Sequence, residues 1–300
     1  MGNTLNYVLI TPARNEASFI EQIINFMIPQ TARPVKWVIV SDGSTDGTDD
    51  IVRKYISHNP WIELLRMPER AGRDFAAKVH AFNAGYDRVK NLDFEIVGNL
   101  DADLSFEPDH FEFLMGKMAE NPHLGVAGAP FREGSYQYDY RFQNIENVWG
   151  GCQLFRRECF ESIGGYLPVK GGGIDHIAVL TARMKGWQTR TFTEKVCLHH
   201  RQMNTASQGA LKAKFKFGEK DYNVGNHPLW EVVRTLYQMT QRPFIIGGLA
   251  LGWGYAWSLI RGREIAVSSE LAAFVRREQM QRLKNRITTL RNRRPRQDNN

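Results

Sequence analysis

A short apolar run ends on two acidic residues in Phe94-Glu95-Ile96-Val97-Gly98-Asn99-Leu100-Asp101-Ala102-Asp103. The run up to Leu100 is typical of a buried β-strand. Side chains two positions apart on an extended chain point to the same side, so two carboxylates there repel each other unless a cation lies between them. Because Mg²⁺ and Mn²⁺ prefer oxygen ligands, we predict that Asp101 and Asp103 hold Mn²⁺ or Mg²⁺. The alternative is a solvated acidic turn.

On both sides of this run, apolar strands alternate with stretches of helical period. Such alternation predicts an α/β domain with a Rossmann-like, mostly parallel sheet flanked by helices. The expected strands are residues 7–11, 35–40, 62–65, 94–100 and 124–128, and the expected helices are residues 16–28, 46–55, 75–89 and 108–118.

The pattern changes after residue 130. Residues 131–149 are rich in aromatic and polar side chains without a clear period, which predicts a loop or short strands over the site. We therefore expect the α/β domain to cover residues 1–205 and a helical region to cover residues 206–300. Further helices are expected at residues 152–162, 175–185, 228–241 and 264–290, with an uncharged apolar run at residues 243–260.

Two more polar loops follow the first two expected strands, Thr11-Pro12-Ala13-Arg14-Asn15-Glu16 and Asp42-Gly43-Ser44-Thr45-Asp46-Gly47-Thr48. In such sheets ligands bind beyond the carboxyl ends of the strands, and the glycines of the second loop let the backbone approach a ligand closely. Asp42 can accept hydrogen bonds from a base or a ribose, whereas Asp46 is interpreted as a helix cap. The first loop has no glycine, which excludes a GxGxxG dinucleotide site and argues against a nucleotidyltransferase.

These motifs, in this order, resemble the family 2 glycosyltransferases of GT-A fold. Two further segments are similar to parts of that family: Lys78-Val79-His80-Ala81-Phe82-Asn83-Ala84-Gly85, and the segment from Gly150-Gly151 through Phe155-Arg156-Arg157 to Gly164-Gly165-Tyr166. The resemblance covers about residues 5–205 and implies that these form the catalytic domain. It also implies a nucleotide-diphosphate-sugar donor, a UDP-sugar ahead of a GDP-sugar, and a glycan or lipid-linked acceptor in polysaccharide biosynthesis.

The resemblance assigns roles to single residues. It implies that Thr11, Asn15 and Asp42 hold the nucleoside, with Lys78 near the nucleotide pocket. Asp101 is expected to face the ribose or the metal, and Asp103 to ligate the metal. The expected substrate-binding set is Thr11, Ala13, Asn15, Glu16, Asp42, Lys78, Asp101 and Gly151.

The catalytic base of the family lies in a Glu-Asp pair that opens a helix about eleven residues before a glycine. Here Ile174-Asp175 precedes Gly186 at that distance, so Asp175 matches the Asp and Ile174 replaces the Glu. The resemblance implies that Asp175 deprotonates an acceptor hydroxyl in an inverting transfer; the alternative is a helix cap. We also expect His200, more than His199, to contact the metal or the diphosphate. The Gln-x-x-Arg-Trp motif of processive synthases is not evident, which favours transfer of a single sugar.

The C-terminal region suggests a membrane contact. Residues 243–260 are borderline for a bilayer span, which needs about 20 residues, and arginines flank them at Arg242 and Arg261. Trp253 and Trp257 suit a membrane interface. The net charge of +7 lies in residues 261–300, with 11 Arg or Lys and 4 Asp or Glu, which favours an anionic surface. We expect a peripheral or re-entrant contact; the alternative is a helical pair packed on the domain or a dimer contact.

Cysteine content and the N-terminus bear on location and partners. Cys152, Cys159 and Cys197 form no CxxC pair, and the N-terminal residues do not resemble a signal peptide. We expect reduced, buried thiols and a cytoplasmic protein at the inner face of the cytoplasmic membrane. Nucleic-acid binding by the basic tail would leave the acidic motif unexplained, so no nucleic-acid partner is expected.

Overall fold

The computed structural model describes residues 5–69, 75–134, 136–137, 144–169, 172–201 and 209–292. The chain divides into two compact units, Met1–Gln202 and Met203–Asn300, and each is described by itself. The domain boundary expected between residues 205 and 206 falls at residues 202–208, outside the described part of the chain.

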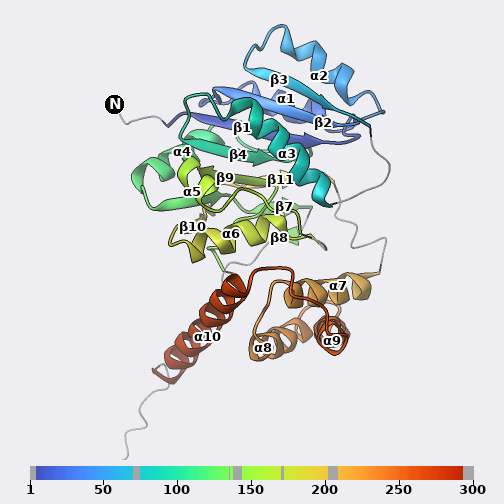
Figure 1. Cartoon of the computed structure of the whole chain (residues 1–300), viewed down its shortest axis with the longest axis vertical. Coiled ribbons are helices and arrows are strands. Elements are labelled where there is room, and N and C mark those ends of the chain that lie inside the picture. The colour runs from blue at the N-terminus through green and yellow to red at the C-terminus, as the bar shows by residue number, and fades with distance from the viewer. Residues whose placement is uncertain are drawn as a thin grey trace, which may run out of the picture. The chain divides into compact units, whose positions relative to one another are not determined.

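The first unit is built on a seven-stranded sheet with the order β10-β6-β9-β4-β1-β2-β3 (Figure 1). The neighbours β1 and β2, β1 and β4, β2 and β3, and β6 and β10 are parallel, whereas β9 is antiparallel to both β4 and β6. The expected α/β class with a mainly parallel sheet is therefore confirmed. The strands are β1 (Tyr7–Ala13), β2 (Lys36–Asp42), β3 (Ile62–Met67), β4 (Ile96–Leu100), β6 (Leu124–Gly128), β9 (Cys152–Arg156) and β10 (Gln188–Thr191).

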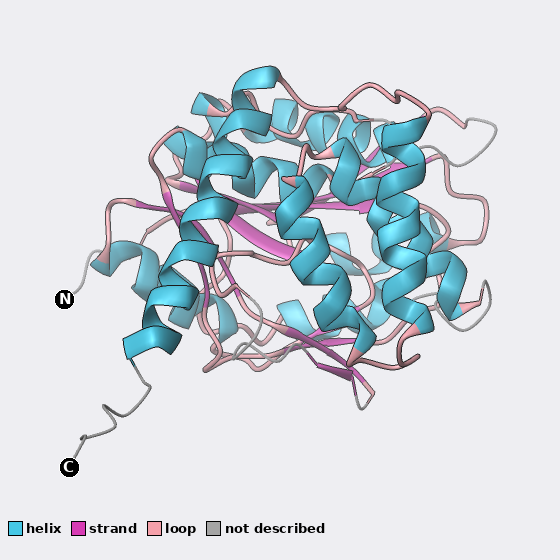
Figure 2. Ribbon diagram, turned by 90° about the horizontal axis from the view of Figure 1, so that it is seen from below, coloured by secondary structure: helices cyan, strands magenta, loops and turns pink. Residues whose placement is uncertain are grey.

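Two apolar clusters form because successive side chains of a strand point to opposite faces of the sheet. In β1, Tyr7 and Leu9 belong to one cluster, and Val8 and Ile10 belong to the other. Figure 2 shows the strands in magenta and the helices in cyan. Helices α1 (Ile20–Met27), α2 (Thr48–Ile56) and α4 (His110–Glu120) supply the first cluster, and α3 (Phe75–Val89), α5 (Arg157–Ser162) and α6 (Ile174–Met184) supply the second.

The helix expected over residues 152–162 is wrong in its first half, because Cys152–Arg156 is strand β9 and only Arg157–Ser162 is helical. A short apolar run has no period that separates a buried strand from a buried helix. Pairing decides the matter here: Cys152 pairs with Leu100, at the end of β4. Strand β9, which was not predicted from the sequence, therefore lies directly beside β4, the strand that leads to Asp101.

A second, small sheet has the strand order β5-β11-β7-β8. β5 (Leu104–Ser105) follows Asp103, and β11 (Cys197–His199) pairs with both β5 and β7. β7 (Phe131–Glu133) and β8 (Tyr136–Gln137) lie in the segment expected to form a loop or short strands. Since β11 pairs with β5, the residues at the end of β11 are brought to Asp103.

All described elements of the second unit are helices: α7 (Ala210–Asn223), α8 (Pro228–Met239), α9 (Ile246–Ile260) and α10 (Ser269–Asn292). Of these helices, α7 has no counterpart among those expected from the sequence. α9 covers most of the apolar run 243–260, and within the described residues no helix has both the length and the apolar character needed to cross a bilayer. Glycines let α7 and α9 approach closely: a Cβ at Gly218 would clash with the carbonyl oxygen of Leu251, and a Cβ at Gly254 with that of Phe215.

This close approach predicts that Gly218→Ala destabilises the second unit by about 1–3 kcal/mol, since the added methyl group meets backbone that cannot move aside easily. Gly116→Ala in α4 is the matched control, because no described neighbour lies within 4 Å of the added Cβ there. The control should gain about 0.5–1 kcal/mol from helix propensity. Chemical denaturation followed by circular dichroism measures both, and equal stabilities of the two variants would contradict the packing of α7 on α9.

Candidate active site

Asp101 lies where β4 ends, between a lysine and an asparagine. Its backbone N–H donates to the carbonyl oxygen of Gly151 at 2.7 Å. Its Oδ1 accepts from Lys78 Nζ at 2.6 Å and from Asn99 Nδ2 at 3.2 Å. The structure thus brings together Lys78, Asp101 and Gly151, three residues of the expected substrate-binding set.

Residues at the end of β11 and just after it contact the carboxylate of Asp103. Its Oδ2 lies 3.0 Å from Arg201 Nε and 3.5 Å from His199 Nε2, and Arg201 also pairs with the carboxylate of Glu16. The His200 N–H donates to the backbone carbonyl of Asp103 at 2.9 Å, but the His200 ring contacts Ser105 Oγ at 2.8 Å and Gln22 Nε2 at 3.0 Å. It is therefore the ring of His199, not that of His200, that lies against the Asp103 carboxylate.

Carboxylates and cations compete at this edge of the sheet. Burial raises the pKa of Asp101, and the positive charge of Lys78 partly offsets this shift. Burial and the negative charges of Asp103 and Asp101 raise the pKa of Glu16 to about 7, although the positive charge of Arg201 acts in the opposite direction. Burial alone would raise the pKa of Asp103, but His199 and Arg201 outweigh it and lower that pKa. Part of the acidic cluster is thus neutralised by protein cations, with which a divalent ion would compete for the carboxylate oxygens.

The first polar loop is fastened to the second. Asn15 adopts a left-handed conformation with φ of 54°, so its Oδ1 accepts from Thr45 N at 2.9 Å while its own N–H donates to Ser44 Oγ at 3.1 Å. The N–H of Glu16 donates to Thr48 Oγ1 at 2.8 Å. These bonds fix the expected nucleoside loops against each other.

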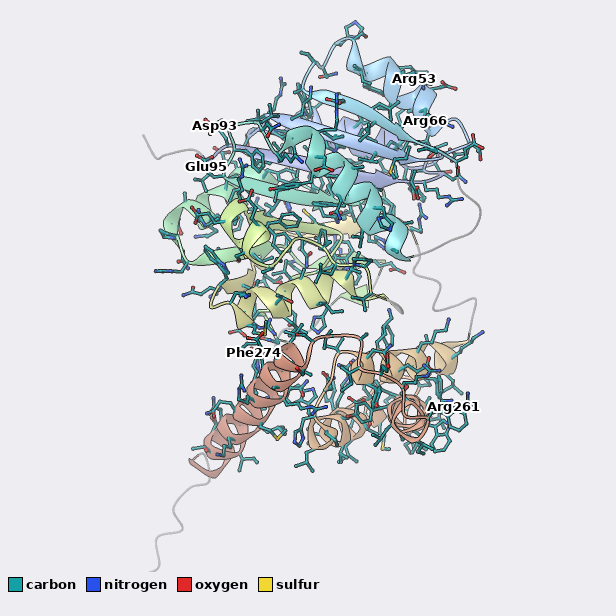
Figure 3. All side chains as sticks on the ribbon, in the orientation of Figure 1. Arg53, Arg66, Asp93, Glu95, Arg261 and Phe274 are labelled. Atoms are coloured by element: carbon teal, nitrogen blue, oxygen red, sulfur yellow. The ribbon has the colours of Figure 1, made fainter. Side chains whose placement is uncertain are left out.

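Asp46 and Arg66 also make hydrogen bonds that hold the second loop in place. Asp46 accepts from the N–H of Thr48 at 3.1 Å, at the start of α2, and from the N–H of Ala17 at 3.0 Å. Arg66, labelled in Figure 3, donates to the carbonyl oxygen of Ser44 at 3.1 Å and pairs with Asp49. The N-cap of α2 is Gly47 and not the expected Asp46, which lies one residue earlier and joins the two loops.

Three residues expected to contact the nucleoside or substrate are buried near the carboxyl ends of β1 and β2. The hydroxyl of Thr11 is buried and accepts from Trp37 Nε1 at 2.9 Å. Ala13 is buried at the end of β1, and Asp42 is buried at the end of β2. Their roles as ligand contacts stay predictions, and the contact of Thr11 with Trp37 shows that its side chain has a packing role.

Asp175 lies in the first turn of α6, against Gly150. A Cβ at Gly150 would collide with the Asp175 carboxylate, and the carbonyl oxygen of Gly150 accepts from Asn99 Nδ2 at 2.6 Å. Burial lowers the pKa of Lys78, but Asp101, Asp175 and Asp103 together raise it above its usual value. Asp175 is therefore within electrostatic reach of the Lys78–Asp101 pair. A Cβ at Gly151 would clash with the indole ring of Trp149.

Asn99, Glu133 and Arg201 were not assigned from the sequence, and His199, the less favoured of the two expected histidines, is the one whose ring lies against Asp103. Asn99 joins Asp101 to Gly150, and Glu133 Oε2 lies 3.3 Å from His199 Nδ1. Burial lowers the pKa of His199, but Asp103 and Glu133 outweigh it and raise the pKa. A signal was present in the run His199-His200-Arg201, where a cation follows two imidazoles, but only the pairing of β11 with β5 shows which side chain faces Asp103.

Comparison with known proteins gives the family. The succinoglycan biosynthesis protein ExoA of Rhizobium meliloti is 27% identical over 182 residues, which cover 53% of this chain and 52% of that protein. The chain spans about half the length, or less, of the curated relatives that it matches.

Solved structures share the fold. The mannosyltransferase PcManGT from Pyrobaculum calidifontis, in complex with GDP-Man and Mn²⁺, superposes with a TM-score of 0.58 at 20% identity, covering 98% of this chain and 82% of that one. Residues 1–349 of TarS from S. aureus, in complex with UDP-GlcNAc, give a TM-score of 0.54 at 13% identity, covering 90% of this chain and 78% of that one. The model of the family described as glycosyl transferase family 2 matches residues 8–162, just over half of the chain. The chain therefore belongs to glycosyl transferase family 2.

Proposed function

We propose that this chain transfers a sugar, with inversion, from a nucleotide-diphosphate-sugar to a hydroxyl of a glycan or lipid-linked acceptor in polysaccharide biosynthesis. The observation that carries the proposal is the position of Lys78, which pairs with Asp101 at 2.6 Å and lies within electrostatic reach of Asp103 and Asp175. Family membership and the relative ExoA, a succinoglycan biosynthesis protein, support it.

The donor set at the end of β4 fits a divalent cation. Asp101 and Asp103 offer carboxylate oxygens, and His199 offers an imidazole nitrogen 3.5 Å from Asp103, a combination that suits Mn²⁺ and, for the oxygens, Mg²⁺. His200 is the alternative nitrogen ligand expected from the sequence. When bound, the ion would supply positive charge for the departing diphosphate. The solved PcManGT complex contains Mn²⁺, which supports this assignment.

Asp175 is the base of the proposed reaction. Its half-exposed carboxylate takes the proton of the acceptor hydroxyl as the new bond forms between the acceptor oxygen and the anomeric carbon. The bond from the anomeric carbon to the diphosphate oxygen breaks in the same step, so the configuration inverts. Lys78 and Arg201, which lie at Asp101 and Asp103, contribute positive charge where the diphosphate would leave.

The two fastened loops are the proposed nucleoside site. Thr11, Ala13, Asn15, Glu16 and Asp42 gather at the carboxyl ends of β1 and β2, where ligands bind in sheets of this kind. The solved neighbours hold UDP-GlcNAc and GDP-Man, which supports a nucleotide-sugar donor. A UDP-sugar ahead of a GDP-sugar stays a prediction.

Asp103→Asn and Asp175→Asn should each lower turnover by about 100-fold or more, since one removes a metal ligand and the other the base. Asp109→Asn is the matched control, because Asp109 is half exposed and pairs with Lys195 at 2.6 Å on the surface. Release of nucleoside diphosphate from a panel of nucleotide-sugars, with Mn²⁺ or Mg²⁺, measures the rates. Full activity of Asp175→Asn would refute the base, and activity that survives a chelator would refute the metal.

The second unit carries the proposed membrane contact. The apolar residues of α8 recur at helical spacing on its exposed side, with exposed fractions of 60% for Leu229, 57% for Val232 and 57% for Leu236. The opposite side of α8 is polar but turned inward, because Glu231 is buried and Arg234 pairs with Asp221 at 3.2 Å. This is the reverse of the pattern in a water-exposed helix.

α9, which packs against α8, also exposes apolar side chains. Ile246, Leu249 and Trp253 are each more than half exposed, and Trp253 lies 5.9 Å from Trp257. The guanidinium of Arg261, labelled in Figure 3, lies 4.4 Å from the Trp257 ring at the end of the helix. Exposed apolar residues, interfacial tryptophans and a flanking arginine favour a bilayer with anionic headgroups over a second protein. The unit would lie in the interface without crossing it.

Leu236→Glu and Trp253→Glu should each weaken binding to vesicles by about tenfold or more, because each withdraws a large apolar side chain from the bilayer and adds a negative charge. Val35→Glu in the first unit, where Val35 is 43% exposed, is the control and should bind like the unaltered chain. Co-sedimentation with vesicles containing phosphatidylglycerol measures binding, and neutral phosphatidylcholine vesicles should bind less. Unchanged sedimentation of both variants, or a stable dimer that excludes vesicles, would contradict the membrane contact.

A further inference from the structure

Three buried side chains from distant parts of the chain converge beneath the acidic site. His110 opens α4, Cys152 opens β9 and Cys197 opens β11. His110 Nε2 lies 3.8 Å from Cys152 Sγ and 3.7 Å from Cys197 Sγ, and the three atoms all lie within 4.8 Å of one another. All three side chains have no measurable exposure.

The third cysteine shows what an ordinary buried thiol looks like in this protein. Cys159 lies in the apolar cluster on the other face of the sheet, and burial raises its pKa to about 12. Cys152 and Cys197 instead lie in the opposite cluster, where their Sγ atoms are 3.8 and 3.7 Å from the His110 Nε2 atom. Cys152 and Cys197 thus differ from the small buried hydrophobe expected of every cysteine in this chain.

The two nitrogen–sulfur distances, 3.8 and 3.7 Å, are close to the spacing of ligand atoms around one ion. With metal–sulfur and metal–nitrogen bonds of about 2.3 and 2.0–2.1 Å, two tetrahedral ligand atoms lie roughly 3.5–3.8 Å apart. The imidazole ring is already oriented by stacking on Phe106, with ring centroids 5.0 Å apart, and by an edge contact with Phe111. We propose that His110, Cys152 and Cys197 bind a thiophilic metal ion, Zn²⁺ or Cu⁺, at a site separate from that of Asp101 and Asp103.

The ligand types separate the two metal sites. Two sulfurs and an imidazole select Zn²⁺ or Cu⁺, whereas the carboxylates of Asp101 and Asp103 select Mg²⁺ or Mn²⁺. Among the described residues no fourth His, Cys, Asp or Glu joins the group. A three-ligand protein set suits a trigonal Cu⁺ ion, or a Zn²⁺ ion whose remaining ligand is not one of these side chains.

The position of the site gives it a structural role. Cys152 pairs with Leu100, next to Asp101, and Cys197 lies two residues before His199 on β11. An ion bound by both cysteines would tie the central sheet to the small sheet directly behind the residues that hold Asp101 and Asp103. Its loss should lower the melting temperature of the first unit.

Metal content of the full chain tests the site without any assay of activity. The chain is loaded with Zn²⁺, or with Cu⁺ under a reductant, dialysed against a weak chelator and measured by mass spectrometry. We expect a stoichiometric amount of one of the two ions in the unaltered chain, in Cys159→Ser and in Asp103→Asn, and its loss in Cys152→Ser, Cys197→Ser and His110→Asn. Absence of retained metal from the unaltered chain, or equal retention in the cysteine variants, would overturn the proposal.

A second measurement covers variants that fail to fold. Titration of the unaltered chain with Co²⁺ should produce a thiolate-to-cobalt charge-transfer band, which carboxylate ligands do not give. The charge-transfer band should persist in Cys159→Ser and in Asp103→Asn. Its absence from the unaltered chain, or recovery of Cys152 and Cys197 as a disulfide under reducing conditions, would contradict the metal site. A lack of glycosyl transfer would leave this result unaffected, so the two proposals fail separately.

Discussion

Electrostatic repulsion among the carboxylates at the end of β4 is the constraint on which the site depends. Asp101, Asp103 and Glu16 meet where water is largely excluded, and like charges so placed need cations. Lys78 supplies one at Asp101, and Arg201 bridges Asp103 and Glu16. Fixed protein cations therefore lie against these carboxylates.

The fold delivers these charges through strands that are out of sequence order. β9 runs antiparallel between β4 and β6, which places Gly150 and Gly151 beside Asp101. β11 pairs with β5, which brings His199 and Arg201 to Asp103 from almost a hundred residues further along the chain. The same two strands carry Cys152 and Cys197, so the proposed thiophilic site and the acidic site share one framework.

Apart from β10, the sequence predicted the parallel strands, and it predicted the acidic motif, because both are local: a buried strand appears as an apolar run, and its polar end follows directly. It could not predict β9, since Cys152–Arg156 is as apolar as a buried helix and only pairing with β4 decides. For the same reason the choice between His199 and His200 required the register of β11 with β5. In the second unit, the composition suggested a membrane contact, but the inward-facing Glu231 of α8 became visible only in the packed bundle.

The central claim is that Asp101 and Asp103 bind a divalent cation together with a nucleoside diphosphate. Isothermal titration of the full chain with UDP or GDP, with and without Mn²⁺, tests it most directly. We expect Mn²⁺ to increase the affinity for one of the two nucleotides by at least about tenfold. The Asp103→Asn variant should lose this effect of Mn²⁺ on nucleotide affinity. Nucleotide affinities that are the same with and without Mn²⁺ would contradict it.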